Sequence, residues 1–174
     1  MHRAISNKLS SVLLAATAVL FMSGSALAVT VDRTQTQYGA GACQGNLPVS
    51  ATQLRARPLA IKNEGTSNAF ISCSLPADDY FGALNDFNGV ALTNSTGAAV
   101  NVSCTLVTGN IDFPVTFFPK TVSVAANSLG VVSWSPAADN GNAPFDNSLN
   151  YSCSVPPGVE INSVFTNISE EVGA

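Results

Sequence analysis

The sequence predicts an all-β protein folded as a two-sheet antiparallel sandwich, immunoglobulin-like or jelly-roll, with about eight or nine strands. Three segments with one alternating pattern support this class: residues 71–75, 99–107 and 151–155. In each, a cysteine shares a face with apolar residues, while serine, threonine or asparagine occupies the other face, as in a half-buried strand. Turn residues recur regularly, and no segment has a convincing amphipathic helical period. A closed barrel would show the same alternation and is the second choice.

The first 28 residues have the organisation of a secretory signal peptide. Arg3 and Lys8 make a positive leader, an apolar run follows, and Ala26-Leu27-Ala28 resembles a cleavage signal. The apolar run is short for a membrane span, and no later segment is a candidate for one. We expect cleavage after Ala28 and a secreted or periplasmic protein, with a leader of bacterial type. The 174 residues less these 28 leave 146, residues 29–174, a normal size for a single domain.

Four cysteines follow the expected cleavage site, and an even number in an exported chain indicates disulfides. Successive cysteines are 30, 31 and 49 residues apart and include no Cys-x-x-Cys pair, which argues against a metal site. Four cysteines allow three pairings. We favour Cys43–Cys73 and Cys104–Cys153, because sequential bridges would tie neighbouring parts of the sandwich together.

Two hairpins are expected in the first half of the sandwich. Residues 54–62 alternate as a strand, and Pro58 confines that strand to an edge or a bulge. A turn beginning at Asn63 connects it to the first cysteine strand, so that the two strands form a hairpin. Residues 87–93 and a turn beginning at Asn94 repeat the arrangement before the second cysteine strand.

Further strands are expected in the second half. Residues 115–118 and 121–124 are predicted as two strands broken by Pro119. Residues 130–134 form another strand, in which Trp134, the single tryptophan, lies on the apolar face and is expected in the core.

The two ends of the mature chain are more polar. Residues 29–38 predict an edge strand or a loose arm. The tail at 169–174 is expected to be mobile.

Composition excludes several kinds of function. The single histidine, His2, lies in the leader, so the mature chain lacks Ser-His-Asp and Cys-His catalysis and histidine zinc sites. Five basic and eleven acidic residues then give a net charge of −6, which disfavours nucleic acid and anionic lipid as partners. The acids form no recognisable catalytic motif. We expect no enzyme activity, no cofactor and no nucleic-acid partner.

Two loops have the composition of a ligand site. Residues 78–87 combine three aromatic residues with three aspartates, but we favour the simpler interpretation, in which the rings cover the end of the sandwich. Residues 135–148 are rich in Asp, Asn, Gly and Pro. The oxygen-rich part at 139–146 is a candidate calcium loop, but turn chemistry explains the same composition, and we assign no metal site.

Arg55 and Arg57 fall on one face of the strand expected at 54–62. They could hold an anion or a carboxylate. The commoner role of such a pair is to blunt an edge strand with charge.

These observations predict a non-enzymatic exported β-sandwich with a structural, adhesive or envelope-associated role. The alternative is an extracellular module that binds a glycan or a small molecule through the loops at 78–87 or 135–148. A glycosidase with two carboxylates is the catalytic class most compatible with a chain lacking histidine, and we favour it least. The sequence identifies no partner; a protein and a glycan are the candidates, and the fold class does not choose between them.

Overall fold

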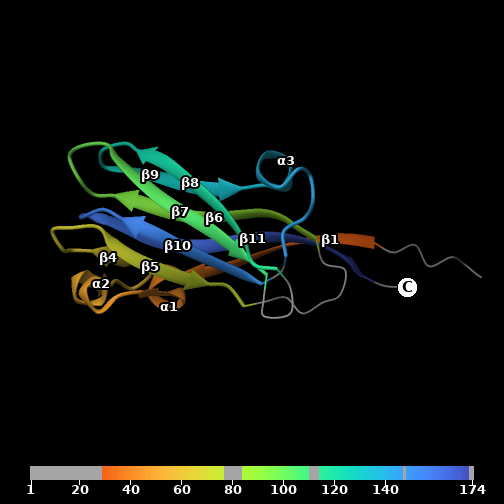
Figure 1. Ribbon diagram of the computed structural model, residues 1–174, viewed down its shortest axis with the longest axis horizontal. Coiled ribbons are helices and arrows are strands. Elements are labelled where there is room, and N and C mark those ends of the chain that lie inside the picture. Colours follow the sequence, from red (N-terminus) through yellow and green to blue (C-terminus); the bar gives the residue numbers. More distant parts are fainter. Residues whose placement is uncertain (1–28, 77–83, 110–113, 147, 173–174) are drawn as a thin grey trace, which may run out of the picture.

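The computed structural model describes residues 29–76, 84–109, 114–146 and 148–172, which form eleven strands in two antiparallel sheets (Figure 1). This confirms the predicted two-sheet sandwich. Sheet A has the strand order β3-β4-β11-β6-β9, and β1 pairs with β11 beyond β4. Sheet B has the order β2-β5-β10-β7-β8.

Most strands follow the alternation seen in the sequence. Sheet A contains β1 (Val29–Tyr38), β3 (Leu54–Ala56), β4 (Ile61–Asn63), β6 (Leu84–Asn94), β9 (Ser128–Trp134) and β11 (Val159–Val172). Sheet B contains β2 (Cys43–Gly45), β5 (Ala69–Ser74), β7 (Val100–Thr108), β8 (Thr116–Val124) and β10 (Leu149–Val155). In the described part of the chain, three short helices connect strands: α1 (Gly39–Ala42), α2 (Pro48–Gln53) and α3 (Pro136–Asp139).

Strands β4 to β11 have the topology of a jelly roll. Their order is β4-β11-β6-β9 in one sheet and β5-β10-β7-β8 in the other, so the chain changes sheet at most connections. Of the two sandwich types predicted, the structure therefore has the jelly-roll type. Strands β1, β2 and β3 extend its edges.

All three alternating cysteine strands lie in sheet B with their cysteines facing the core, where Cys73, Cys104 and Cys153 are buried. Disulfides join Cys43 to Cys73 and Cys104 to Cys153, which are the two pairs that the sequence analysis favours. Each bridge connects residues directly opposite each other on neighbouring strands, with Cα atoms 4.0 Å apart. The bridges therefore staple β2 to β5 and β7 to β10 within one sheet.

The largest buried side chains meet between the sheets. Trp134 is buried, as predicted, and its ring centroid lies 5.9 Å from that of Tyr151. Its Nε1 donates a hydrogen bond to the Phe118 carbonyl oxygen at 2.8 Å. An indole in a core requires such an acceptor, and this one connects β9 of sheet A to β8 of sheet B.

The two ends of the sandwich differ. At one end, which we call the turn end, four tight connections cross between the sheets, after β4, β6, β8 and β10 (Figure 1). Backbone hydrogen bonds link these turns, for example from the Gly158 amide to the Asn63 carbonyl at 2.8 Å and from the Asn127 amide to the Thr96 carbonyl at 3.0 Å. The opposite end, which we call the loop end, has the longer connections, including 135–148.

The two predicted hairpins are wrong. Strand β4 pairs with β3 and β11, whereas β5 pairs with β2 and β10, so the turn after Asn63 crosses between sheets. The turn after Asn94 crosses in the same way, from β6 to β7. In both turns the asparagine side chain binds backbone groups of the opposite sheet, which stabilises a crossing turn.

Three other expectations need correction. Residues 54–62 do not form one strand, because Pro58 lies in the connection between β3 and β4. Pro119 does not break its segment and instead lies within β8, which tolerates it as an edge strand. Residues 169–172 of the tail expected to be mobile belong to β11 and pair with β1, and Glu170 is buried in an ion pair with Arg33. Residues 173 and 174 lie outside the described residues.

Strand β1 is an edge strand, as one of the two alternatives for residues 29–38 predicts. Among the described residues, no helix is long and apolar enough to cross a membrane.

Candidate functional site

The loop end contains an open hollow of about 410 Å³, which we call the end hollow. One wall comes from sheet B, with Thr108 at the end of β7 and Thr116 and Phe118 at the start of β8. The other wall comes from the 135–148 loop, with Asn140, Pro144, Phe145 and Asp146; Pro114 completes the lining. Its volume falls within the range of small-molecule sites.

Strand alternation places the sheet B side chains of the hollow. Thr108 and Thr116 are opposite each other in the β7–β8 register, and Phe118 is the next residue of β8 on the same side. The Phe118 ring meets the buried Phe145 ring edge-on, with centroids 5.0 Å apart and planes at 83°. This is a favourable geometry for two aromatic rings, and it gives the hollow a rigid aromatic floor.

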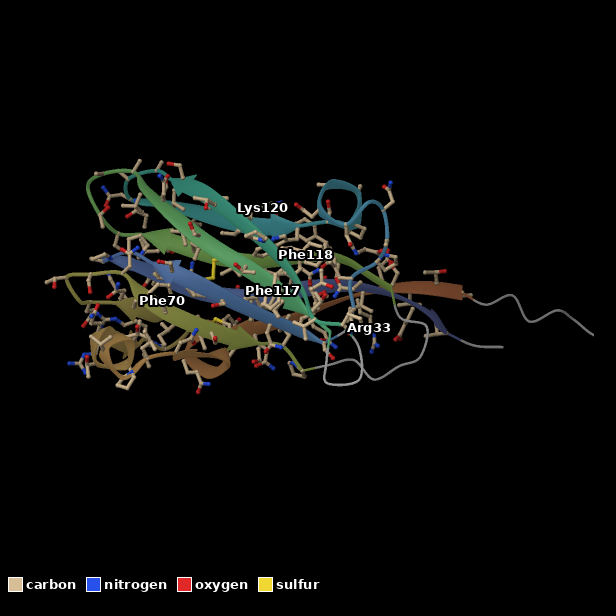
Figure 2. The ribbon with its side chains drawn as sticks, in the orientation of Figure 1. Arg33, Phe70, Phe117, Phe118 and Lys120 are labelled. Carbon is tan, nitrogen blue, oxygen red and sulfur yellow. A yellow bond between two sulfur atoms is a disulfide. The ribbon has the colours of Figure 1, made fainter. Side chains whose placement is uncertain are left out.

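An ion pair fixes the base of the loop to β8. Lys120 Nζ lies 2.7 Å from Asp139 Oδ1 and 2.9 Å from Oδ2, and it also donates to the Ser133 carbonyl at 2.7 Å (Figure 2). Asp139 Oδ2 accepts the Ser135 amide at 2.9 Å. Asp139 is thus used to hold α3 in place, which leaves it poorly placed to act as a calcium ligand.

The rest of the loop folds around Asn140. Its Nδ2 donates to the carbonyl oxygens of Ala143, at 2.8 Å, and Pro144, at 3.1 Å. Gly141 and Asn142 between them have φ values of 58° and 69°, a left-handed conformation that these two residue types adopt most readily. Asp146 Oδ1 accepts a hydrogen bond from the Ser148 amide at 3.0 Å, and this bond holds the carboxylate in place at the rim of the hollow. The loop wall is therefore preformed.

Among the described residues that line the end hollow, one has a charged side chain, Asp146. The nearby charges of Lys120 and Asp139 neutralise each other. The described lining therefore presents a carboxylate, a carboxamide, two hydroxyls and two aromatic rings to a small volume. Its one negative charge disfavours anionic ligands. In the described part of the chain, no cluster of three or more Cys, His, Asp or Glu side chains is arranged to hold a metal ion.

A buried polar network lies behind the hollow, between the sheets. The Tyr151 hydroxyl donates to the Phe165 carbonyl at 3.1 Å and reaches Asn88 Oδ1 at 3.3 Å. Asn88 Nδ2 donates to Asn85 Oδ1 at 2.8 Å, which also accepts Thr166 Oγ1 at 3.1 Å. Burial raises the pKa of the Tyr151 hydroxyl far above its usual value, so the network is held by a neutral phenol.

The predicted loops have different outcomes. The 135–148 loop forms one wall of the end hollow. Residues 78–83 of the 78–87 loop lie outside the described residues, and the remainder belongs to β6, where the Phe87 ring stacks on Phe165 with centroids 5.9 Å apart. Arg55 lies in β3, the outermost strand of sheet A, and Arg57 directly follows that strand; both form ion pairs with Glu64. They therefore hold a carboxylate of their own chain.

The contribution of β8 to the site is not predicted by any pattern in the sequence. Phe118 and Thr116 become site residues because β8 begins beside the 135–148 loop, and this neighbourhood depends on strand order. The exposure of Phe70 and Phe117, 47% and 64%, is not predicted either. Phe70 offered a sequence signal, because it is out of phase with Ile71 and Cys73 on the buried face of its strand.

Comparisons with known proteins give distant structural similarities. No protein-family model matches the sequence, and no curated protein sequence matches it significantly. The chain is similar to a family 6 carbohydrate-binding module of a laminarinase from Zobellia galactanivorans, with TM-score 0.45 and 10% identity over 77% of this chain and 98% of that one. It is also similar to a xylanase fragment from Clostridium thermocellum that contains a family 22 carbohydrate-binding module and was solved with xylohexaose, with TM-score 0.41 and 10% identity. That match covers 83% of this chain but 26% of the other.

A third similar structure comes from disulfide-linked pili of Bacillus endospore appendages, with TM-score 0.30 and 11% identity over 85% of this chain and 89% of that one. These three structures belong to proteins with different roles. At such identities and TM-scores, none of them assigns a function to this chain.

Proposed function

We propose that the protein is a non-catalytic exported binding protein that holds a short carbohydrate in the end hollow. The observation that carries this proposal is the lining itself, in which the Phe118 ring faces the same small volume as the Asp146 carboxylate and the Asn140 carboxamide. A sugar ring has an apolar face that packs on an aromatic ring and hydroxyl groups that donate to oxygen acceptors.

The acceptors of the hollow are available for such a ligand. Asn140 uses its Nδ2 within the loop, which leaves Oδ1 able to accept. Asp146 uses Oδ1 for the Ser148 amide, which leaves Oδ2 able to accept a second, charge-assisted hydrogen bond. Because the loop already has its shape, little ordering cost opposes binding.

The same lining favours binding over hydrolysis. Glycoside hydrolysis needs two carboxyl groups on either side of the scissile bond. Among the described residues that line the hollow, Asp146 is the one carboxylate. The other acid of the loop, Asp139, is engaged with Lys120 and the Ser135 amide.

The two disulfides are consistent with a protein located in an oxidising compartment. All four cysteines are in disulfides, and such bonds persist outside the cytosol. Export is therefore part of the proposal, together with removal of residues 1–28, which lie outside the described residues.

Calorimetric titration of the oxidised protein with a panel of neutral mono- and disaccharides tests the proposal. We expect at least one to bind, Asp146→Asn to weaken it about tenfold or more, and Phe118→Leu to weaken it about threefold to tenfold. Asn at 146 can still accept the Ser148 amide, so the loop should keep its fold. Glu160→Gln at the turn end removes one acid far from the hollow and serves as the matched control. Absence of binding across the panel, or equal affinity in Asp146→Asn, would overturn the proposal.

A structural or adhesive role, the first expectation from the sequence, stays a second candidate. The observation that favours it is β1, whose ten residues pair with β11 along one edge and lie mostly exposed. An exposed strand edge can pair with another chain. Light scattering on the oxidised protein should then show concentration-dependent assembly that Thr34→Pro abolishes. A monomer at all concentrations would reject this role.

A further inference from the structure

In the described strands of sheet B, no charged side chain faces outward. Its side chains come from the polar positions of the alternating strands, such as Ser72 and Ser74 on β5, Ser152 on β10 and Thr105 on β7. Within the described strands β2, β5, β10, β7 and β8, the one charged residue is Lys120, and it faces Asp139 instead of this surface. We call the outward surface of these five strands the hydroxyl face.

Sheet A provides a contrast within the same molecule. Its strands include Asp32, Arg33, Lys62, Asp86 and Glu160, as is usual for a solvated sheet in a soluble protein. The hydroxyl face instead presents mostly serine, threonine and asparagine, with Val107 and Pro119 beside Phe117. Some of these pair with each other, as in Ser103 with Thr121 at 2.7 Å.

Two exposed aromatic rings lie at opposite corners of the hydroxyl face. Phe70 on β5 is 47% exposed, and Phe117 on β8 is 64% exposed (Figure 2). The register places Phe70 in line with Ser154, Ser103 and Thr121 across the sheet, and Phe117 is four residues from Thr121 along β8. With strands about 4.8 Å apart and a rise of about 3.4 Å per residue, the two phenylalanines are roughly 20 Å apart.

We infer that the hydroxyl face is a second binding surface, which takes an uncharged polysaccharide chain long enough to contact both Phe70 and Phe117. Each phenylalanine ring can pack on the apolar face of a sugar ring. The serine and threonine hydroxyls between them can both donate and accept, so they match the hydroxyls of a neutral sugar without a charge to desolvate. A charged polymer finds no counter-charge here.

This arrangement suits a polysaccharide better than a second copy of the chain. Protein–protein interfaces concentrate aromatic residues at the centre and polar groups at the rim. On the hydroxyl face the order is reversed, because the centre is polar and the aromatic rings lie at the corners. A long ligand with repeating apolar and hydroxyl surfaces can use separated rings, whereas a rigid protein surface would bury many unpaired hydroxyls.

The inference shares the carbohydrate class of the proposed function but uses a different surface. The two surfaces meet at β8, where Phe118 faces the end hollow and Phe117 faces the opposite way. The hollow has room only for a short sugar. A ligand that spans the roughly 20 Å between Phe70 and Phe117 must instead be a chain of several sugar units.

Native gel electrophoresis in gels that contain laminarin, barley β-glucan, galactomannan or alginate tests the inference. We expect retardation by at least one of the three neutral polymers, none by the anionic alginate, and little change when the salt concentration is raised. Phe70→Ala and Phe117→Ala should each weaken the retardation about threefold to tenfold, and the double variant should lose most of it. Tyr38→Ala removes a similarly exposed aromatic residue from sheet A and should bind as the parent does.

The two proposals fail separately. If Phe70→Ala and Phe117→Ala bind the polymers as the parent does, or if no neutral polymer retards the protein, the hydroxyl face is not the surface we infer. Light scattering that shows dimers lost in Phe117→Ala would also overturn it in favour of a second copy. The end hollow alone would be upheld if Asp146→Asn loses the binding of short sugars while the Phe70 and Phe117 variants retain the polymer retardation of the parent.

Discussion

Asn63 and Asn94 occupy equivalent positions at the turn end. Each is fully buried and is the last residue of a strand in sheet A. Asn63 Nδ2 donates to the carbonyl of Val155, the last residue of β10, at 2.8 Å, and Asn94 Nδ2 donates to that of Val124, the last residue of β8, at 3.1 Å. In both, Oδ1 accepts a backbone amide two residues later at 2.9 Å. The same side chain thus builds two sheet-crossing turns.

We expect Asn94→Ala to lower the free energy of unfolding by about 2–4 kcal/mol, because the buried Val124 carbonyl and the partly buried carbonyls of Ala98 and Ala125 lose their donor. Asn94→Asp should be similarly destabilising, since it keeps the acceptor but removes the donor. Urea denaturation measures both. Asn68→Ala breaks an exposed bond to Ser154 and should change stability by less than about 0.5 kcal/mol. Equal effects at 68 and 94 would contradict the role of the turn.

The two disulfides should contribute separately. Replacing Cys104 and Cys153 by alanine opens a loop of 49 residues and should cost about 4 kcal/mol, and replacing Cys43 and Cys73 opens one of 30 and should cost slightly less. Denaturation of the two double variants under oxidising conditions measures each cost. Because the bridges join neighbouring strands of the same sheet, the double variants should retain their far-UV spectrum at low temperature. An undiminished midpoint in either variant would show that the bridge does not restrict the unfolded chain.

Stability at high pH should depend on Tyr151. Its pKa is raised in the folded protein, so above pH about 10 the unfolded chain loses a proton that the folded chain keeps, and stability falls as the pH rises. The slope from this group approaches about 1.4 kcal/mol per pH unit. Tyr151→Phe should be less stable near neutral pH, where Phe165 and Asn88 lose their donor, and its stability should approach that of the parent above pH about 10.

Denaturation curves between pH about 7 and 11 test this convergence. Tyr38→Phe, at an exposed position, should keep the slope of the parent. Parallel stability curves for the parent and Tyr151→Phe would show that the buried hydroxyl does not cause the dependence.

Lys120→Met should weaken sugar binding in the end hollow without affecting polymer binding on the hydroxyl face. The substitution removes the ion pair that holds α3 to β8, so the wall containing Asn140 and Asp146 loses its anchor. The pair is partly exposed, so we expect a stability loss of only about 1 kcal/mol. Calorimetry and native gels on the same variant separate the two effects. Lys62→Met, in sheet A, is the control and should change neither.

The sequence predicted which face of each strand is buried more reliably than which strands are neighbours. The phase of Cys73, Cys104 and Cys153 with apolar residues follows from local geometry, so the inward direction of all three could be inferred. A turn beginning at Asn63, by contrast, looks the same whether the next strand pairs with the last one or crosses to the other sheet. The difference lies in its bond to Val155, far along the chain.

For the same reason, only part of the candidate site could be predicted. The 135–148 loop could be nominated from its composition, because turn residues and oxygen-bearing side chains are local features. Phe118 could not, since it belongs to the site through the packing of β8 against Phe145. The sequence also could not predict that strand pairing continues through Pro119, because a proline affects an edge strand and a central strand differently.

The pairing of β1 with β11 brings Val29 opposite Val172, so the beginning of the first described strand and the end of the last one lie side by side near the loop end. A short Gly/Ser linker could therefore join these two residues and produce a circularly permuted chain. New ends opened in the Asn140–Ala143 turn would release one wall of the end hollow while leaving both sheets, both disulfides and the hydroxyl face covalently intact. The fold thus permits the two candidate surfaces to be separated by changing the order of the chain, without replacing a side chain in either one.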